Sequence, residues 1–300
     1  MNTVIVIAGP TAVGKTKAAI EIASHFQTEI ISADSRQCYK ELRIGVARPS
    51  NEELSQVRHH FIASHSITEE INAASYEQYA LAIAEQIFSK SQIAVMVGGT
   101  GLYIKAFCEG LDAIPGINTE IRNQIIEDYE KKGIEWLKEQ LRESDPHFAA
   151  AGEMMNPQRM MRALEVKMGT GKSIIEFRRN EKAQRPFNII KIGLELPREM
   201  LKTRIDQRVD AMIEEGLIAE VKTLFPFRDQ NALQTVGYRE VFEYLDGIVS
   251  LPEAVERIKI NTRQYAKRQM TWFKKDSELH WVKPGDISGI ISSLDQRLER

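Results

Sequence analysis

Short apolar runs alternate with amphipathic stretches along most of the chain. Four of these runs have the length and composition of buried strands: residues 4–8, 29–33, 92–97 and 188–194. Helical periodicity fills the intervals, and this alternation is typical of a mainly parallel sheet flanked by helices. We therefore predict an α/β fold. In such sheets ligands bind beyond the carboxyl ends of the strands, so the residues that follow the runs are the first candidates for a site.

The middle of the chain breaks this pattern. From about Ile114 to Arg185 the sequence is helical, charged and poor in strand runs. Proline and glycine residues punctuate both of its ends, as they do at element boundaries. We predict a helical insertion over residues 114–185, whose end can alternatively lie near residue 155. The core would then consist of residues 1–113 and 186–300.

Composition and charge exclude several classes of protein. The 300 residues are 43% hydrophobic and 27% charged, which is typical of a globular protein with a large core. A net charge of −2 gives no general affinity for polyanions, so any contact with nucleic acid has to come from local basic patches. Cys38 and Cys108 offer neither a metal-ligand spacing nor a disulfide framework, which fits a reducing cytosol. No run approaches the ~20 apolar residues of a membrane span, so we expect no membrane association.

The first apolar run ends in a phosphate-binding motif. The motif has the pattern G-x-x-x-x-G-K-[ST] and precedes a helical stretch. Backbone N–H groups of such a loop surround phosphates, the lysine contacts the outer phosphate, and the hydroxyl of Thr16 is placed to hold Mg²⁺. The motif predicts a diphosphate or triphosphate ligand and does not specify the reaction. Its residues are Gly9, Pro10, Thr11, Ala12, Val13, Gly14, Lys15 and Thr16.

Two further segments follow predicted strands and lie at the same edge of the sheet. Asp34 can support Mg²⁺, accept a proton from an attacking group, or cap the following turn, and the sequence leaves these roles open. Thr100 lies in Gly98-Gly99-Thr100-Gly101, where it can donate to a leaving-group oxygen or simply form a tight turn.

Basic residues recur at helical spacing in three places. Arg159 and Arg162 lie one turn apart after Asn156-Pro157, a capping residue and a proline suited to the first helical position. Either of Arg204 and Arg208 can reach inward to a diphosphate. The third set falls in one sector of the last long helix: Lys259, Arg263, Lys267 and Lys274. Each set can bind phosphate groups, and each can equally be a solvated helix surface.

The motifs together resemble those of the bacterial tRNA dimethylallyltransferase family, over almost the whole chain and in the same order. The matching segments are the phosphate loop and residues 32–37, 59–60, 98–103, 157–166, 237–240 and 262–272. Residues 59–60 are His59-His60, and the last segment contains the run Thr-Arg-Gln-Tyr-Ala-Lys-Arg-Gln. The spacing from Thr100 to Arg122 also fits an arginine that the family uses near the RNA. Four positions depart from the family pattern: Val46, Arg48 and Asn156 stand where threonine, lysine and aspartate are usual, and Arg58 replaces a proline.

The resemblance implies a P-loop NTPase-like core with a helical insertion for tRNA, in a cytoplasmic monomer. It implies transfer of a dimethylallyl group from dimethylallyl diphosphate to N6 of an adenosine next to the anticodon, with Mg²⁺ as cofactor and release of pyrophosphate. Asp34 would be the base, and Thr100, Lys15 and Arg208 would stabilise the leaving group. The residues expected to contact the anticodon stem-loop are Asp34, Ser35, Arg36, Gln37, Thr100, Arg122, Gln158, Arg159, Arg162, Arg263 and Lys267.

Two other functions share part of this pattern. A small-molecule P-loop kinase has the same phosphate loop, although the chain lacks the catalytic-loop signature of protein kinases and a strand-end acid of the hydrolytic type. An isopentenyltransferase that acts on free adenine nucleotides has the same chemistry, but it needs neither the insertion nor a basic helix.

Overall fold

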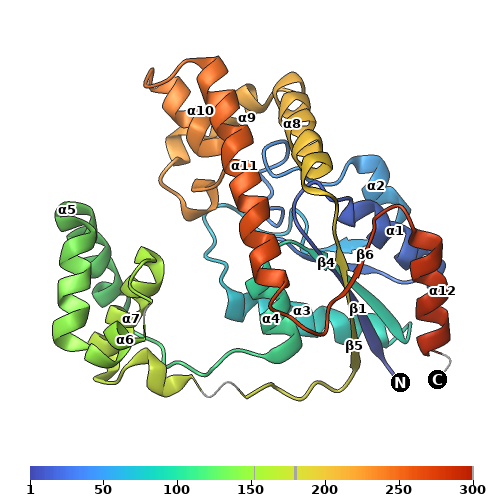
Figure 1. Cartoon of the computed structure of the whole chain (residues 1–300), viewed down its shortest axis with the longest axis horizontal. Helices are drawn as coiled ribbons and strands as arrows, with labels where there is room; N and C mark the ends of the chain where they lie inside the picture. Colours follow the sequence, from blue (N-terminus) through green and yellow to red (C-terminus); the bar gives the residue numbers. More distant parts are fainter. Residues whose placement is uncertain (152, 179–180, 299–300) are drawn as a thin grey trace. The chain divides into compact units, whose positions relative to one another are not determined.

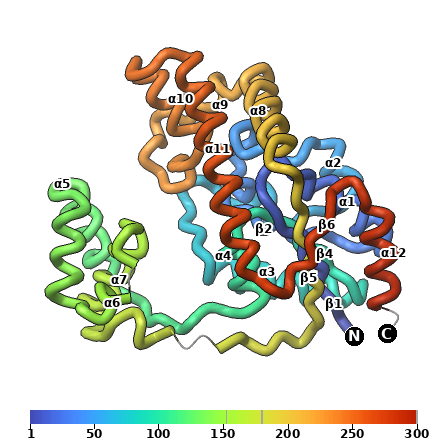
Figure 2. The backbone as a smooth tube through the Cα atoms, in the orientation of Figure 1, coloured from blue at the N-terminus to red at the C-terminus, as the bar shows by residue number. Residues whose placement is uncertain are grey.

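The computed structural model describes residues 1–151, 153–178 and 181–298. They form two compact units, one made of Met1–Cys108 with Gln184–Arg300 and the other of Glu109–Ala183 (Figures 1 and 2). The second unit therefore begins five residues before the position that the sequence suggested and extends well past residue 155.

The first unit is built on a six-stranded sheet in which every pair of strands is parallel. The α/β fold with a mainly parallel sheet is thus confirmed. The strand order is β3-β2-β4-β1-β5-β6. The strands are β1 (Thr3–Ala8), β2 (Ile30–Ala33), β3 (His59–His60), β4 (Ile93–Gly98), β5 (Asn188–Leu194) and β6 (His280–Val282). The edge strands β3 and β6 were not predicted, because two or three residues carry no periodic signal.

The register brings three strand ends together. Gly98 pairs with Ala8 on one side and with Ala33 on the other, so the loops that follow β1, β2 and β4 are neighbours. A Cβ atom on Gly98 would lie 2.2 Å from the carbonyl oxygen of Ala33, which no side chain can accommodate. Glycine at this position therefore permits the close approach of the loops that carry Asp34 and Thr100.

Helices cover both faces of the sheet, as the alternation along β1 requires. The helices of this unit are α1 (Lys15–His25), α2 (Asn51–Gln56), α3 (Ala73–Phe88), α4 (Gly101–Glu109), α8 (Arg198–Glu214), α9 (Leu217–Leu224), α10 (Tyr238–Leu245), α11 (Leu251–Phe273) and α12 (Ile287–Leu298), with 3₁₀ turns η2 (Phe225–Phe227) and η3 (Asn231–Leu233). Val4 and Val6 pack in a core with α3, α4 and α9–α11, whereas Ile5 and Ile7 pack in a second core with α1 and α12 (Figure 1).

Helix α11 runs alongside α8 and lies over the loop that follows β4 (Figure 2). It begins at a capping box in which the Ser250 hydroxyl accepts from the backbone N–H of Glu253. A Cβ atom on Gly101 would lie 2.2 Å from the ring of Trp272. The glycines after β4 therefore serve helix packing as well as any approach to a ligand.

The second unit contains α5 (Thr119–Ser144), α6 (Pro146–Ala150), α7 (Pro157–Thr170) and the 3₁₀ turn η1 (Ile174–Phe177). Helix α5 bends at Gly133, whose φ of 77° lies in the left-handed region. Asn156 accepts from the N–H of Arg159 and Pro157 is the first residue of α7, which confirms the capping predicted there. Leu137, Leu141, Phe148, Met160 and Leu164 form a separate core. Within the described ranges of both units, no helix has the length and apolarity needed to cross a membrane.

Candidate active site

The phosphate loop connects β1 to α1 and opens at the amino end of that helix. Gly9 and Gly14 have φ values of 149° and 106°, which favour glycine. A Cβ atom on Gly9 would also lie 2.7 Å from the carbonyl oxygen of Leu194. The loop amides and Thr16, in the first turn of α1, are therefore arranged as in an anion-binding site.

Lys15 lies folded over the phosphate loop, with its Nζ donating to the carbonyl oxygen of Pro10 at 2.7 Å. Burial lowers the pKa of Lys15 to about 7, and the charge of Arg208 adds to this effect while Asp34 opposes it. The surroundings thus disfavour the ammonium form by itself. An anion that enters the loop would stabilise this charge.

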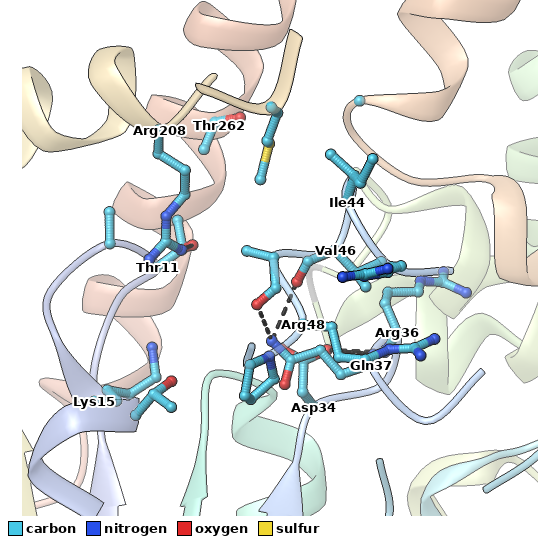
Figure 3. Close-up of a pocket in the computed structure, with 18 of the residues that line it drawn as sticks. Thr11, Lys15, Asp34, Arg36, Gln37, Ile44, Val46, Arg48, Arg208 and Thr262 are labelled. Carbon is cyan, nitrogen blue, oxygen red and sulfur yellow. Dashed lines mark hydrogen bonds between the residues drawn. The ribbon is translucent and has the colours of Figure 1, made fainter. Parts of the chain in front are cut away.

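Arg208 extends from α8 toward the same loop (Figure 3). Its Nη1 donates to the Thr11 hydroxyl at 3.2 Å, and burial lowers the pKa of Arg208. Arg204, one turn earlier, is exposed and donates to the carbonyl oxygen of Val13 at 3.3 Å. Of the two arginines that the sequence left open, Arg208 is therefore the one that lines the cavity.

The Asp34 carboxylate caps the turn that follows β2. Its Oδ1 accepts from the backbone N–H groups of Arg36 at 2.9 Å and Gln37 at 3.2 Å. No group in the described ranges donates a hydrogen bond to Oδ2. Capping by one oxygen fixes the orientation of the carboxylate and leaves the second oxygen to a ligand, so the capping and catalytic roles are compatible.

Thr100 is tied to the same turn. Its Oγ1 accepts from the backbone N–H of Ser35 at 3.0 Å and donates to the Ser35 hydroxyl at 3.3 Å. Gly98 lines the cavity, whereas Thr100 does not. Thr100 therefore links the loops after β2 and β4, and any role toward a leaving group needs its hydroxyl to turn away from Ser35.

These elements surround a cavity of about 520 Å³ (Figure 3). One end is polar and cationic and holds Lys15, Arg208 and the loop amides. Another part of the wall is apolar, with contributions from loop 43–49, α8, residues 235–237 and α11; its members are Ile44, Val46, Val209, Met212, Val236 and Ile258. A ligand with an anionic end and a short apolar group matches this division.

Comparison with known proteins gives the family. The model of a family described as IPP transferase matches residues 37–276. The chain is 45% identical to tRNA dimethylallyltransferase 1 of Bacteroides thetaiotaomicron over 98% of this chain and 96% of that protein. It is 47% identical to the tRNA dimethylallyltransferase of Flavobacterium psychrophilum over the full length of both. The chain belongs to the tRNA dimethylallyltransferase family.

Solved structures agree with this assignment. The crystal structure of the tRNA isopentenylpyrophosphate transferase of Bacillus halodurans matches with a TM-score of 0.74 and 35% identity, over 100% of this chain and 97% of that one. A eukaryotic dimethylallyltransferase acting on tRNA matches with a TM-score of 0.77 and 28% identity, over 99% of this chain and 78% of that one. The P-loop-like core and the enzyme class expected from the resemblance are confirmed.

Two residues of this tRNA dimethylallyltransferase family member were missed as site residues. Gln269, only 6% exposed, accepts from the backbone N–H of Thr11 at 2.9 Å and donates to the carbonyl oxygen of Gly99 at 2.9 Å. Tyr265, one turn earlier on α11, also lines the cavity. Burial, with the charge of Asp34, raises the pKa of Tyr265. The sequence signal that could have identified Gln269 is a polar residue on the buried face of an amphipathic helix.

Of the four basic residues in this sector of α11, two are paired with acidic residues of α8 and two are exposed. Arg263 pairs with Asp206 of α8 at 2.7 Å and Lys259 pairs with Asp210 at 2.6 Å. Their heads are turned to α8 because the two helices pack together there. Lys267 and Lys274 are exposed. The sector is therefore not a uniform, solvent-facing surface. RNA contact by Arg263 stays a prediction, which its pairing with Asp206 disfavours.

The remaining candidates lie in two places. Arg36 donates from Nη1 to the carbonyl oxygen of Asn231 at 2.8 Å, beside the cavity that it lines. Arg122, Gln158, Arg159 and Arg162 belong to the second unit. There Arg162 pairs with Glu165 at 2.7 Å, and Arg159 lies 3.7 Å from Glu153.

Proposed function

We propose that this protein transfers a dimethylallyl group from dimethylallyl diphosphate to N6 of the adenosine next to the anticodon of tRNA. In this step the N6–C1 bond forms, the C1–O bond to the diphosphate breaks, and a proton leaves N6. The observation that carries the proposal is the juxtaposition of the phosphate loop, an oriented carboxylate and an apolar wall in one cavity. A purine amine is a weak nucleophile, so both a base and a stabilised leaving group are needed.

The diphosphate would bind the loop formed by Gly9 to Thr16. The amides of the loop and the amino end of α1 favour an anion, and Lys15 and Arg208 add two charges whose pKa values are lowered by burial. The dimethylallyl group would then contact the apolar wall. Because this wall begins beside Arg208 on α8, at Val209 and Met212, the reacting carbon would lie between the cationic end and the apolar end.

Asp34 would accept the N6 proton through Oδ2. Its orientation is fixed by the two hydrogen bonds to Oδ1, which is how a general base is held in reach of its substrate. Thr100 would donate to the oxygen that departs with the diphosphate. This role of Thr100 is supported by its position after β4, where its hydroxyl is hydrogen-bonded to the turn that contains Asp34.

Mg²⁺ fits this site by the chemistry of its donors. The Thr16 hydroxyl and the Asp34 carboxylate are oxygen ligands that line the same cavity, and Mg²⁺ prefers one or two such ligands together with diphosphate oxygens and water. The described residues contain no cluster of acidic, histidine or cysteine side chains that would hold a metal by itself. We propose Thr16 as the protein ligand. The ion would bind together with the diphosphate and would supply positive charge to stabilise the leaving group.

The tRNA would be held by residues of both units. The target adenosine has to leave its stack to enter the cavity, which costs little in a single-stranded loop. Arg36 and Gln37 line the cavity in the same turn as Asp34 and are proposed to contact the base. Arg122, Gln158, Arg159 and Arg162 of the second unit, and Lys267 of α11, are proposed to contact the anticodon stem-loop backbone. We propose that the protein works as a monomer with its tRNA in the cytoplasm.

The test follows the label from donor to acceptor. Dimethylallyl diphosphate labelled in the allyl group is incubated with Mg²⁺, unmodified tRNA and the protein, and both labelled RNA and released pyrophosphate are measured. We expect them to appear in equal amounts, and to be lost with Asp34→Asn. A parallel reaction replaces the diphosphate by ATP and the tRNA by adenosine monophosphate. ATP turnover there, with no label in tRNA, would contradict the proposal and favour a kinase.

A further inference from the structure

The loop opposite the phosphate loop is fixed by a single carboxylate. Glu220 of α9 accepts hydrogen bonds from three successive backbone N–H groups, those of Arg43 at 3.2 Å, Ile44 at 2.8 Å and Gly45 at 3.1 Å. A fourth comes from the hydroxyl of Tyr238, at 2.6 Å. Successive N–H groups that converge in this way form an anion-binding concavity, which is here filled by a side chain of the protein itself.

The ring of Tyr238 packs so closely against the loop that position 45 has to be glycine. It is fully buried, and a Cβ atom on Gly45 would lie 2.5 Å from its ring. Burial, with the Glu220 carboxylate as the second cause, raises the pKa of Tyr238, so the phenol remains a donor. This contact gives Tyr238 of the Gly237-Tyr238-Arg239-Glu240 segment a role that the proposed chemistry does not supply.

The loop held by Glu220, residues 43–47, is in turn bonded to the side chain of Gln37. Within it, Ala47 donates to the carbonyl oxygen of Ile44 at 2.9 Å, which closes a tight turn. Both carbonyl oxygens that follow, those of Val46 and Ala47, accept from Nε2 of Gln37, at 3.1 and 2.9 Å (Figure 3). Because a carbonyl can only accept, these two bonds determine which end of the amide is nitrogen.

Oε1 of Gln37 is consequently the end of the amide that remains for a ligand. In the part of the chain that the structure describes, no group donates a hydrogen bond to it, and Gln37 lines the cavity beside Asp34. The backbone N–H of Gln37 also bonds to Asp34 Oδ1, so the amide and the proposed base are joined by one turn. An amide fixed in this way presents an acceptor only and selects a base that offers an N–H group.

We propose that Glu220, with Tyr238, is a positioning residue that fixes the Gln37 amide through loop 43–47 and so sets the selection of the acceptor base. This inference rests on the proposed function, because it takes the acceptor to be a nucleobase. Glu220 touches neither substrate; it acts through the loop. Its removal should therefore affect the use of tRNA more than the binding of dimethylallyl diphosphate, to which this loop contributes only Ile44 and Val46 of the apolar wall.

The test is a double-mutant cycle between Glu220→Gln and Gln37→Ala. Glutamine places an N–H group against the three backbone donors, so kcat/KM for tRNA should fall by roughly tenfold or more, the scale of a hydrogen bond to a charged group. The dissociation constant of dimethylallyl diphosphate should rise by much less, because the phosphate loop, Lys15 and Arg208 are not part of loop 43–47. In the Gln37→Ala background, Glu220→Gln should have little further effect. Tyr238→Phe should give a smaller loss with the same coupling, and it covers the case in which Glu220→Gln does not fold. Glu214→Gln, at an exposed position of α8, removes the same charge as a control.

A second readout does not depend on activity. The side-chain amide signals of Gln37, assigned with the Gln37→Ala variant, should exchange slowly with solvent in the wild type and quickly in Tyr238→Phe and Glu220→Gln. Additive losses in the cycle, unchanged exchange of the Gln37 amide, or an equal loss of diphosphate binding would each overturn the inference. Absence of prenyl transfer in the wild type together with altered amide exchange would instead count against the proposed function and leave the positioning role in place.

Discussion

Gln269 joins Thr11 of the phosphate loop to the loop that follows β4. Its amide accepts from the Thr11 N–H and donates to the carbonyl oxygen of Gly99, so one side chain of α11 satisfies both loops of the site. Thr11 and Gly99 are 88 residues apart in sequence, and the helix that links them comes from the last sixth of the chain. The phosphate loop and the loop that carries Thr100 are therefore joined through α11, and we predict that binding of the diphosphate is coupled to the placement of Thr100.

This coupling predicts the effect of Gln269→Leu. Leucine keeps the volume but leaves a buried N–H and a buried carbonyl without partners, so the free energy of unfolding should fall by about 1–3 kcal/mol. Affinity for dimethylallyl diphosphate should fall as well, because the Thr11 amide belongs to the loop. Denaturant unfolding and calorimetric titration measure the two quantities. Unchanged diphosphate affinity in a destabilised variant would show that the bridge serves folding alone.

The base is tested by two substitutions of Asp34. Asparagine retains an oxygen that can accept from Arg36 and Gln37, whereas alanine removes the cap as well as the base. Asp34→Asn should therefore unfold at nearly the wild-type temperature and lower the single-turnover rate by roughly 10²–10⁴-fold, the usual range for a general base. Asp34→Ala should lose about 1 kcal/mol of stability in addition. A near-normal rate in Asp34→Asn would leave Asp34 with the capping role only.

The lowered pKa of Lys15 leads to a prediction for the pH dependence of diphosphate binding. Its pKa in the ligand-free protein is about 7, and a bound diphosphate favours the ammonium, so affinity should fall as the pH rises from 7 to 9. Binding in this range should take up protons, which titrations in buffers of different ionisation enthalpy detect. Lys15→Met should bind more weakly and lose this pH dependence. Equal pH dependence in both proteins would place the titrating group elsewhere.

The same shift has a consequence for folding. The pKa of Lys15 is lower in the folded than in the unfolded chain, so the unfolded chain binds more protons between pH 7 and about 10 and stability contributed by this group rises with pH. At pH 7 and below, Lys15→Met should therefore raise the melting temperature of the ligand-free protein by a few degrees. A lower melting temperature would show that the contact with Pro10 outweighs the cost of burying the charge.

The exposed Lys267 and Lys274 and the paired Arg263 of α11 should affect the salt dependence of tRNA binding differently. Lys267→Gln and Lys274→Gln together should weaken tRNA binding and reduce the log–log salt slope by about 0.7–0.9 for each phosphate group that is no longer neutralised. Arg263→Gln should leave the slope unchanged, because its guanidinium pairs with Asp206, and should lower stability instead. Filter binding over a range of salt concentrations gives the slopes. A reduced slope in Arg263→Gln alone would reverse this assignment.

The features of the fold and the site that could be predicted from the sequence are those encoded by short-range patterns. The four long strands and the motif from Gly9 to Thr16 were predicted because their periodicity and glycine spacing are local. Strands β3 and β6 are too short to give such a signal, and the pairing of Arg263 with Asp206 depends on which side of α11 packs on α8. Gln269 and Glu220 were missed for the same reason, since each joins segments that are distant in sequence and only the fold brings these together.

The central claim is that N6 of the adenosine next to the anticodon receives the allyl group at this cavity. The most direct test is mass spectrometry of nuclease fragments and nucleosides from tRNA incubated with wild-type protein, Mg²⁺ and dimethylallyl diphosphate. The account predicts one added dimethylallyl group, on the base of that adenosine, and none with Asp34→Asn. An added group on another nucleotide, an unmodified tRNA with wild-type protein, or an equal yield with Asp34→Asn would contradict it.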